Sequence, residues 1–264
     1  MKAPGFWRRY KERSFRKREK RKAENGKKFL FSLYRPSSFV AEQFKIIRTM
    51  VLRSGKDRAC RTLLITSALP EEGKTFVSSN LAVSMAQSVS DQVVLIDSDL
   101  RNPSLHLLFG IGREREGLTT FCAKDIKVTD VLYRTHLQNL LFMPAGLPSD
   151  KNMEGLSTEK LQRLIRDIRQ LHKDCFVIFD TGPVQLLADS LMISDLVDGV
   201  ILVVRIGDTK REVLDKTINT LQERKIIGVV LNYCKVPKEL YHGYHRYYAK
   251  AAQVERIAGS FEKE

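Results

Sequence analysis

The chain has 264 residues, of which 43% are hydrophobic and 8% aromatic, so it can bury one sizeable core. Its four cysteines are scattered without a C-x-x-C spacing, which argues against a disulfide framework, a zinc site or an iron–sulfur cluster. No apolar run approaches the roughly 20 residues that span a bilayer, and the N-terminus has no hydrophobic signal segment, so we expect a cytoplasmic protein.

The net charge of +14 is concentrated near the N-terminus. Residues 1–28 hold 13 Lys or Arg against three Glu, so the rest of the chain is only modestly basic and we expect no specific nucleic-acid partner. Each Lys or Arg beside anionic lipid contributes about 1 kcal/mol, which would allow this segment to hold the protein on an anionic membrane surface, at the inner face of the cell membrane. The alternative is a solvated extension with no fixed partner.

The first predicted core element is a helix over residues 41–53, which follows a helix-start signal at Pro36-Ser37-Ser38. Apolar residues recur along it at helical spacing, so one face should be buried. The residues expected on that face are Phe44, Ile47, Met50 and Val51.

Strand and helix then alternate along the chain. Strands are predicted at 63–66, 93–96, 140–143, 175–179, 200–204 and 226–231, and helices at 75–88, 158–172 and 210–224, with short helices at 105–109 and 130–133. Because the strands are continuous apolar runs, helices should cover both faces of the sheet. The sequence therefore predicts an α/β fold, a doubly wound, mainly parallel sheet of the P-loop NTPase kind.

The loop Leu69-Pro70-Glu71-Glu72-Gly73-Lys74-Thr75 lies between the first strand and its helix. Backbone N–H groups at a helix N-terminus can surround phosphate oxygens, while Lys74 adds an ammonium and Thr75 a hydroxyl for Mg²⁺. The usual G-x-x-x-x-G-K-[ST] pattern would place its first glycine at Ala68, so the match is incomplete and a plain turn is the alternative. The strand–loop–helix context favours a phosphate-binding loop.

Carboxylates follow two of the predicted strands. Asp97 and Asp99 come after residues 93–96, and Asp180 comes after residues 175–179. The C-terminal ends of parallel strands meet at one edge of a sheet, so these acids should line one crevice with the loop. The alternative is a set of solvated turn residues.

Three segments together resemble the bacterial tyrosine kinases of capsule and exopolysaccharide synthesis, which are similar in fold to the cell-division and partitioning ATPases. Residues 66–75, 95–103 and 177–183 would be the Walker A, A′ and B elements. The partitioning ATPases would carry a second lysine at Leu69, and its absence favours the kinase branch. Residues 188 onward resemble the family's penultimate strand region.

The resemblance implies ATP and Mg²⁺ as cofactors and a catalytic set of Lys74, Asp97 and Asp99. Lys74 would contact the β- and γ-phosphates, and Asp97 would accept the proton of an incoming tyrosine hydroxyl. Arg101 would either neutralise phosphate or form an ordinary surface ion pair. The nucleotide-binding residues would be Glu72, Gly73, Lys74, Thr75, Phe76 and Asn232, and the metal-binding residues Thr75, Asp99 and Asp180.

Three positions depart from the family pattern. Glu71 stands where the kinase loop would have Gly, Lys45 replaces the first Arg of the family's oligomerisation helix, and Gly182 replaces Pro. The rest of that helix motif is present as Glu42 and Arg48. The resemblance therefore implies a homo-oligomeric ring built through Glu42, Lys45 and Arg48, and a membrane polysaccharide co-polymerase as activator.

Half of the eight tyrosines lie close together: Tyr241, Tyr244, Tyr247 and Tyr248. The leading hypothesis is that they are phosphoacceptors presented to a neighbouring subunit; the alternative is a packed helical stripe. We expect a basic tail at 1–35, a kinase domain at 36–236 and the tyrosine cluster with a short helix at 237–264. The rival function is a nucleotide-dependent, membrane-associated switch ATPase without tyrosine kinase activity.

Overall fold

A computed structural model describes residues 28–54, 60–147, 156–221, 226–235, 239 and 243. The chain divides into two compact units, one that ends at Asn232 and one from Tyr233 onward, and the fold described below is that of the first. Residues 1–27 of the basic tail and the four clustered tyrosines, Tyr241, Tyr244, Tyr247 and Tyr248, lie outside the described residues.

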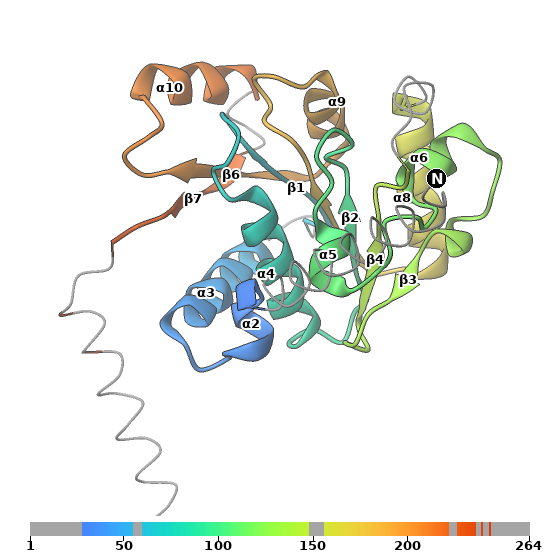
Figure 1. Ribbon diagram of the computed structural model, residues 1–264, viewed down its shortest axis with the longest axis horizontal. Coiled ribbons are helices and arrows are strands. Elements are labelled where there is room, and N and C mark those ends of the chain that lie inside the picture. The colour runs from blue at the N-terminus through green and yellow to red at the C-terminus, as the bar shows by residue number, and fades with distance from the viewer. Residues whose placement is uncertain are drawn as a thin grey trace, which may run out of the picture. The chain divides into compact units, whose positions relative to one another are not determined.

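The first unit is built on a seven-stranded sheet with the order β3-β4-β2-β5-β1-β6-β7 (Figure 1). All neighbouring strands are parallel except β3 and β4, which are antiparallel. The strands are β1 (Thr62–Ser67), β2 (Val93–Asp97), β3 (Tyr133–Arg134), β4 (Leu140–Met143), β5 (Phe176–Asp180), β6 (Gly199–Arg205) and β7 (Ile226–Asn232). The predicted doubly wound, mainly parallel sheet is confirmed.

Helices cover both faces of this sheet. Figure 1 shows α2 (Phe31–Tyr34), α3 (Phe39–Arg53) and α4 (Lys74–Ala86) on one side and α9 (Ala188–Leu196) and α10 (Arg211–Thr220) on the other. The remaining helices are α5 (Leu105–Phe109), α6 (Leu118–Ala123), the 3-10 turn η1 (Val128–Asp130) and α8 (Thr158–Leu171). Among the described residues, none of these helices has the length and apolarity needed to cross a membrane.

Two buried clusters fill the space between helices and sheet. One packs α3 and α4 against the strands, with Phe44, Leu81 and Met85 in it, and the other packs α8 and α9, with Leu164 and Ile193 in it. The strands β1, β2 and β5 are buried at every position, which explains their uninterrupted apolar sequences. The core is thus two-sided, as expected for parallel strands between helical layers.

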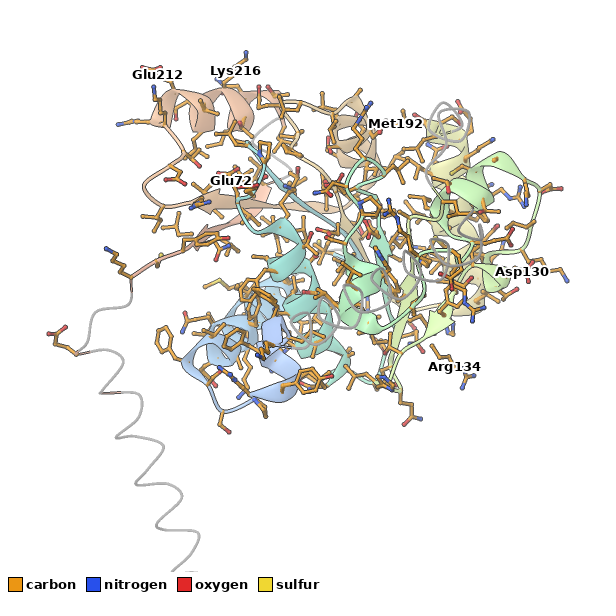
Figure 2. All side chains as sticks on the ribbon, viewed as in Figure 1. Glu72, Asp130, Arg134, Met192, Glu212 and Lys216 are labelled. Carbon is orange, nitrogen blue, oxygen red and sulfur yellow. The ribbon has the colours of Figure 1, made fainter. Side chains whose placement is uncertain are left out.

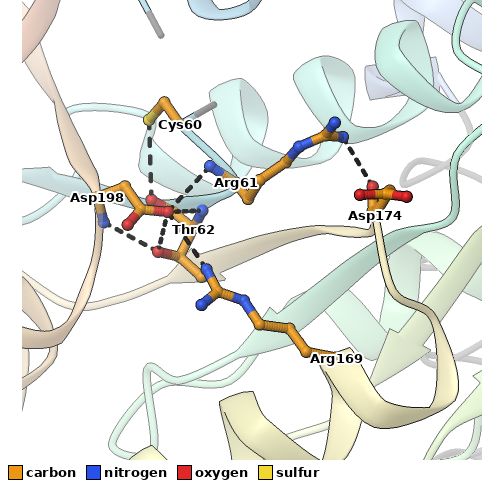
Figure 3. A network of polar contacts seen from close by, with 6 residues as sticks. All are labelled: Cys60, Arg61, Thr62, Arg169, Asp174 and Asp198. Carbon is orange, nitrogen blue, oxygen red and sulfur yellow. Dashed lines mark hydrogen bonds and ion pairs between the residues drawn. The ribbon is translucent and has the colours of Figure 1, made fainter. Parts of the chain in front are cut away.

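At the N-terminal ends of β1 and β6, Asp198 is the centre of a network of hydrogen bonds (Figure 3). Its carboxylate accepts hydrogen bonds from the backbone N–H of Arg61 at 2.9 Å and of Thr62 at 2.8 Å, and from the Thr62 hydroxyl at 2.7 Å. Arg169 of α8 lies 3.4 Å from the same oxygen. This network joins the starts of β1 and β6 at the edge away from the carboxylates that follow β2 and β5.

Several local predictions were wrong. The segment 130–133 is not one helix, because η1 ends at Asp130 and Tyr133 begins the antiparallel strand β3. Met50 is 63% exposed although Phe44 and Val51 are buried, and the last helix ends at Thr220.

Candidate functional site

The loop between β1 and α4 adopts the shape of a phosphate cradle. Gly73 caps α4 with a φ of 94°, a left-handed conformation that glycine adopts without strain. Glu71 also has a positive φ, of 61°, which is costly for a residue with a Cβ. The family pattern has glycine at this position, and the local backbone gives the physical reason. The first N–H groups of an α-helix have no intrahelical partner, so those at the start of α4 are the candidates for contacts with phosphate.

Lys74 is largely buried at the start of α4, with 7% of its surface exposed. Burial lowers the pKa of its ammonium, while the negative charges of Asp180, Asp99 and Glu72 act in the opposite direction. The predicted phosphate-binding cation is therefore surrounded by the predicted acids. The neighbouring acids thus oppose the loss of ammonium charge that burial favours.

Thr75 and Asp180 are in direct contact. The Thr75 hydroxyl donates a 2.8 Å hydrogen bond to Asp180 Oδ2, and Ser104 Oγ lies 3.4 Å from the same hydroxyl. Burial raises the pKa of Asp180 to about 7, and the bond from Thr75 and the charge of Lys74 limit the rise. Two of the three predicted metal-binding residues thus meet in one place.

Asp97 is opposite Asp180 in the register of β2 and β5. Its Oδ2 accepts hydrogen bonds from the backbone N–H of Ser104 and of Leu105, both at 3.1 Å. Its exposed fraction is 0%, and burial together with the charge of Asp180 raises its pKa well above the usual range. The structure therefore places the predicted proton acceptor beneath the segment that follows β2, not at an open surface.

Asp99 lies farther along that segment. Its Oδ1 accepts the backbone N–H of Asn102 at 3.1 Å, and its charge acts on Lys74 and Asp180. A Cβ built on Gly182 would come within 3.5 Å of Asp99 Oδ1 and would overlap Leu187 Cδ1. Gly182 stands where the family has proline, and Leu187 fills the space that a side chain at position 182 would need.

The residues present fit a magnesium ion. Three buried polar atoms at the ends of β2 and β5 have no hydrogen-bond partner among the described residues: Asp97 Oδ1, Ser98 Oγ and Asp180 Oδ1. Oxygen donors of this kind suit Mg²⁺, which proteins hold through one or two carboxylates, with water and phosphate completing the shell. No cluster of three or more His, Cys, Asp or Glu forms a self-sufficient cage in the part of the chain that the structure describes.

The other predicted nucleotide-binding residues lie on either side of the loop. The side-chain amide of Asn232, at the end of β7, donates a 2.9 Å hydrogen bond to the Glu72 carbonyl. The Phe76 ring packs edge-on against Phe31 and Phe44, with centroids 6.0 and 5.6 Å apart, so it belongs to the layer of α2 and α3. Phe76 can therefore reach a phosphate only through its backbone N–H.

The predicted oligomerisation residues lie on α3, outside the loop and acid cluster. Glu42 and Lys45 form an ion pair of 2.9 Å on the same helix. Arg48 turns toward α4 and donates a 2.9 Å hydrogen bond to the Ser84 carbonyl. Arg101, for which the sequence left two roles open, is exposed in the segment that follows β2.

Sequence reasoning missed Ser104 and, for the predicted residue Glu72, the contacts of its side chain. Ser104 bonds Asp97 through its N–H and approaches Thr75 through its hydroxyl, and the Glu72 side chain is buried within the loop. A serine just before the apolar start of a helix is a recognisable N-cap signal, so Ser104 could have been singled out. The role of the Glu72 side chain depends on a partner 133 residues away, which no local pattern reveals.

No family model matches the chain. The tyrosine-protein kinase YwqD of Bacillus subtilis (strain 168) is 31% identical to it, over 82% of this chain and 90% of that protein. The tyrosine-protein kinase CpsD of Streptococcus agalactiae serotype III (strain NEM316) is 30% identical, over 76% of this chain and 85% of its own length.

Comparison with solved structures also finds tyrosine kinase domains of similar fold. The chimerical protein CapA2B2 has a TM-score of 0.72 and 26% identity, covering 79% of this chain and 91% of its own. The kinase domain of the Escherichia coli tyrosine kinase ETK has a TM-score of 0.70 and 25% identity, and the match covers 79% of this chain and 82% of that one. The septum site-determining protein MinD of Pyrococcus horikoshii, solved with Mg-ADP, has a TM-score of 0.55 at 23% identity, which shows a likeness of fold alone.

Proposed function

The chain belongs to the bacterial tyrosine-protein kinases, and we propose that it transfers the γ-phosphate of ATP to tyrosine side chains of a second copy of itself. The observation that carries this proposal is the meeting of Lys74, Thr75, Asp97 and Asp180 at one edge of the sheet, with Thr75 bonded to Asp180 at 2.8 Å. A phosphate cradle, a cation and unpaired carboxylate oxygens are what phosphoryl transfer requires.

In this proposal the loop and Lys74 bind the β- and γ-phosphates of ATP. Thr75, Asp99 and Asp180 hold Mg²⁺ directly or through water, and the ion neutralises charge on the phosphates when bound. The Thr75 hydroxyl donates a hydrogen bond to Asp180, so its oxygen already lies beside the carboxylate with which it would share the ion. Gly73 and Phe76 contribute backbone N–H groups, and Asn232 lies at the edge where the base would bind.

Asp97 acts as the proton acceptor in this proposal. Ser104 and Leu105 hold its Oδ2, so Oδ1 is the oxygen left to accept a proton from the tyrosine hydroxyl. Burial and the charge of Asp180 raise its pKa, so Asp97 can accept a proton only after a bound cation has displaced the proton that the raised pKa favours. Because Asp97 is fully buried, the segment that carries Ser104 must move aside before a tyrosine reaches it.

The proposed acceptors are Tyr241, Tyr244, Tyr247 and Tyr248. A ring through Glu42, Lys45 and Arg48 would present them to the next subunit, and phosphorylation would add like charge that favours disassembly. We further propose that a membrane polysaccharide co-polymerase activates the kinase, that the basic tail contacts anionic lipid, and that the reaction regulates exopolysaccharide or capsule synthesis.

The experiment is incubation of the purified protein with Mg-ATP, followed by mapping of phosphotyrosine by mass spectrometry. We expect phosphate within residues 241–248, and its loss in Lys74→Met and Asp97→Asn variants that keep the wild-type circular dichroism spectrum. Absence of phosphotyrosine in the wild type, even with the membrane partner added, would contradict the kinase proposal and leave ATP binding or slow hydrolysis as the function.

A further inference from the structure

Glu72 is the most buried acid of the phosphate loop, with 1% of its surface exposed. Its Oε2 accepts the backbone N–H of Leu69 at 2.7 Å, and its Oε1 accepts the backbone N–H of Arg205 at 3.2 Å. The Thr209 hydroxyl also donates to Oε1. Figure 2 shows Glu72 beside β6, the strand that ends at Arg205. The carboxylate therefore joins the loop to the turn that follows β6.

The backbone of Glu72 makes a second link. Its carbonyl accepts the side-chain amide of Asn232 at 2.9 Å, at the end of β7. One loop residue thus connects to the ends of β6 and β7. The residues that follow it in the chain are Gly73 and Lys74, which bind the phosphates in the proposed function. A displacement of Glu72 would move both of them.

These contacts carry a free-energy cost that simple packing would avoid. A buried carboxylate loses its hydration, and only good hydrogen bonds offset that loss, whereas an apolar side chain of similar size has no such cost. Among the described residues no ion pair includes Glu72, so hydrogen-bond donors alone contact its carboxylate directly. The arrangement gives the loop a defined anchor that apolar packing would not supply.

We propose that Glu72 is a positioning residue for nucleotide binding, which fixes the phosphate loop in its binding shape by anchoring it to the turn after β6. Thr209, which bonds the Glu72 carboxylate, then affects nucleotide affinity through Glu72. The inference rests on the proposed function in one respect, that this loop binds nucleotide phosphates.

Glu72→Gln is the sharpest perturbation, because it keeps the shape of the side chain. Leu69 and Arg205 donate to different carboxylate oxygens, so the amide nitrogen of Gln must face one of these two N–H groups, and that hydrogen bond is lost. Thr209→Val removes the third donor without entering the loop. Thr220→Val on α10 is the matched control, because its hydroxyl bonds Lys216 and Gln185 instead.

The readout is the affinity for a fluorescent ADP analogue with Mg²⁺, measured by fluorescence for the full chain, alongside the thermal unfolding midpoint. We expect Glu72→Gln to weaken affinity about tenfold, the loss typical of one hydrogen bond to a charged group. Thr209→Val should weaken it less, Thr209→Ser should restore it, and the double variant should match Glu72→Gln alone because both act through one group. Thr220→Val should leave the affinity for the analogue unchanged, even if it shifts the unfolding midpoint.

The outcomes separate the two proposals. If Glu72→Gln and Thr209→Val bind the analogue with the same affinity as the wild type, the positioning role is wrong and the kinase proposal stands. Additive losses in the double variant would also overturn it, because Thr209 would then act by another route. Wild-type protein that binds no nucleotide would contradict the proposed function itself. If Glu72→Gln has no cooperative unfolding transition, the comparison of Thr209→Val with Thr209→Ser decides.

Discussion

Replacing Glu71 with glycine should stabilise the protein, because Glu71 has a φ of 61°. A left-handed conformation costs a residue with a Cβ about 1–2 kcal/mol, and the extra freedom of glycine in the unfolded chain costs about 0.5–1 kcal/mol. The difference leaves a gain of about 0.5–1 kcal/mol for Glu71→Gly. For a domain of this size that corresponds to a rise of about 1–4 °C in the unfolding midpoint.

Glu71→Ala separates backbone strain from charge, because it removes the carboxylate but keeps the Cβ. We expect no rise in the midpoint for Glu71→Ala, whereas Mg-ATP affinity should increase in both variants, since an exposed acid beside the phosphates is removed in each. Glu114→Gly is the control, because Glu114 is exposed in a loop without a positive φ. Thermal unfolding followed by circular dichroism measures the midpoints. A midpoint for Glu71→Gly at or below that of Glu71→Ala would refute the strain argument.

The site and its supports yield three further predictions. The folded-state pKa of Asp180, about 7, lies above its unfolded value, so between these two values the folded protein binds one proton more than the unfolded chain. Without Mg²⁺ the protein should therefore lose stability as pH rises through this range, and Asp180→Asn should remove this loss in unfolding titrations. Mg-ATP affinity should rise from about pH 6 to 8 in the wild type but not in Asp180→Asn. Gly182→Ala should destabilise by about 1 kcal/mol through overlap with Leu187, and Leu187→Ala in the same chain should reverse most of it, as measured by urea unfolding. Asp198→Ala should cost about 1–2 kcal/mol by losing the bonds at the start of β1, while Mg-ADP affinity stays unchanged; a weaker affinity would contradict the placement of this network away from the site.

The sheet could be predicted because its signals are local. Solid apolar runs mark β2 and β5, and the acids directly after them had to meet at one edge, as Asp97 and Asp180 do in register. The two-residue strand β3 has no such signal, because its pairing with β4 alone defines it. Met50 lies on the apolar face of α3 and lines a pocket with Ile227 and Val230 of the edge strand β7, yet 63% of its surface is exposed, so periodicity alone gave the wrong burial.

The site was predictable as a set of residues and not as a set of contacts. Lys74, Thr75 and Asp180 could be named from motif order, whereas the hydrogen bond from Arg205 to Glu72 joins residues 133 apart. The reason for glycine at the position of Glu71 is likewise a backbone angle, which the sequence alone does not state. Local patterns identify the chemistry, and long-range hydrogen bonds decide how rigidly it is held.

The charges around Lys74 explain why the nucleotide and the ion should bind together. One ammonium faces Glu72, Asp99 and Asp180, and Asp97 adds a further carboxylate next to Asp180. Burial raises the pKa of both Asp97 and Asp180, so protons reduce the negative charge when no cation is present. ATP without a cation would bring more negative charge into this surplus, whereas a divalent cation can replace those protons and bridge the carboxylates to the phosphates. The unpaired oxygens of Asp97 and Asp180 therefore favour a cation at this site, and we expect nucleotide to bind together with that cation and not before it.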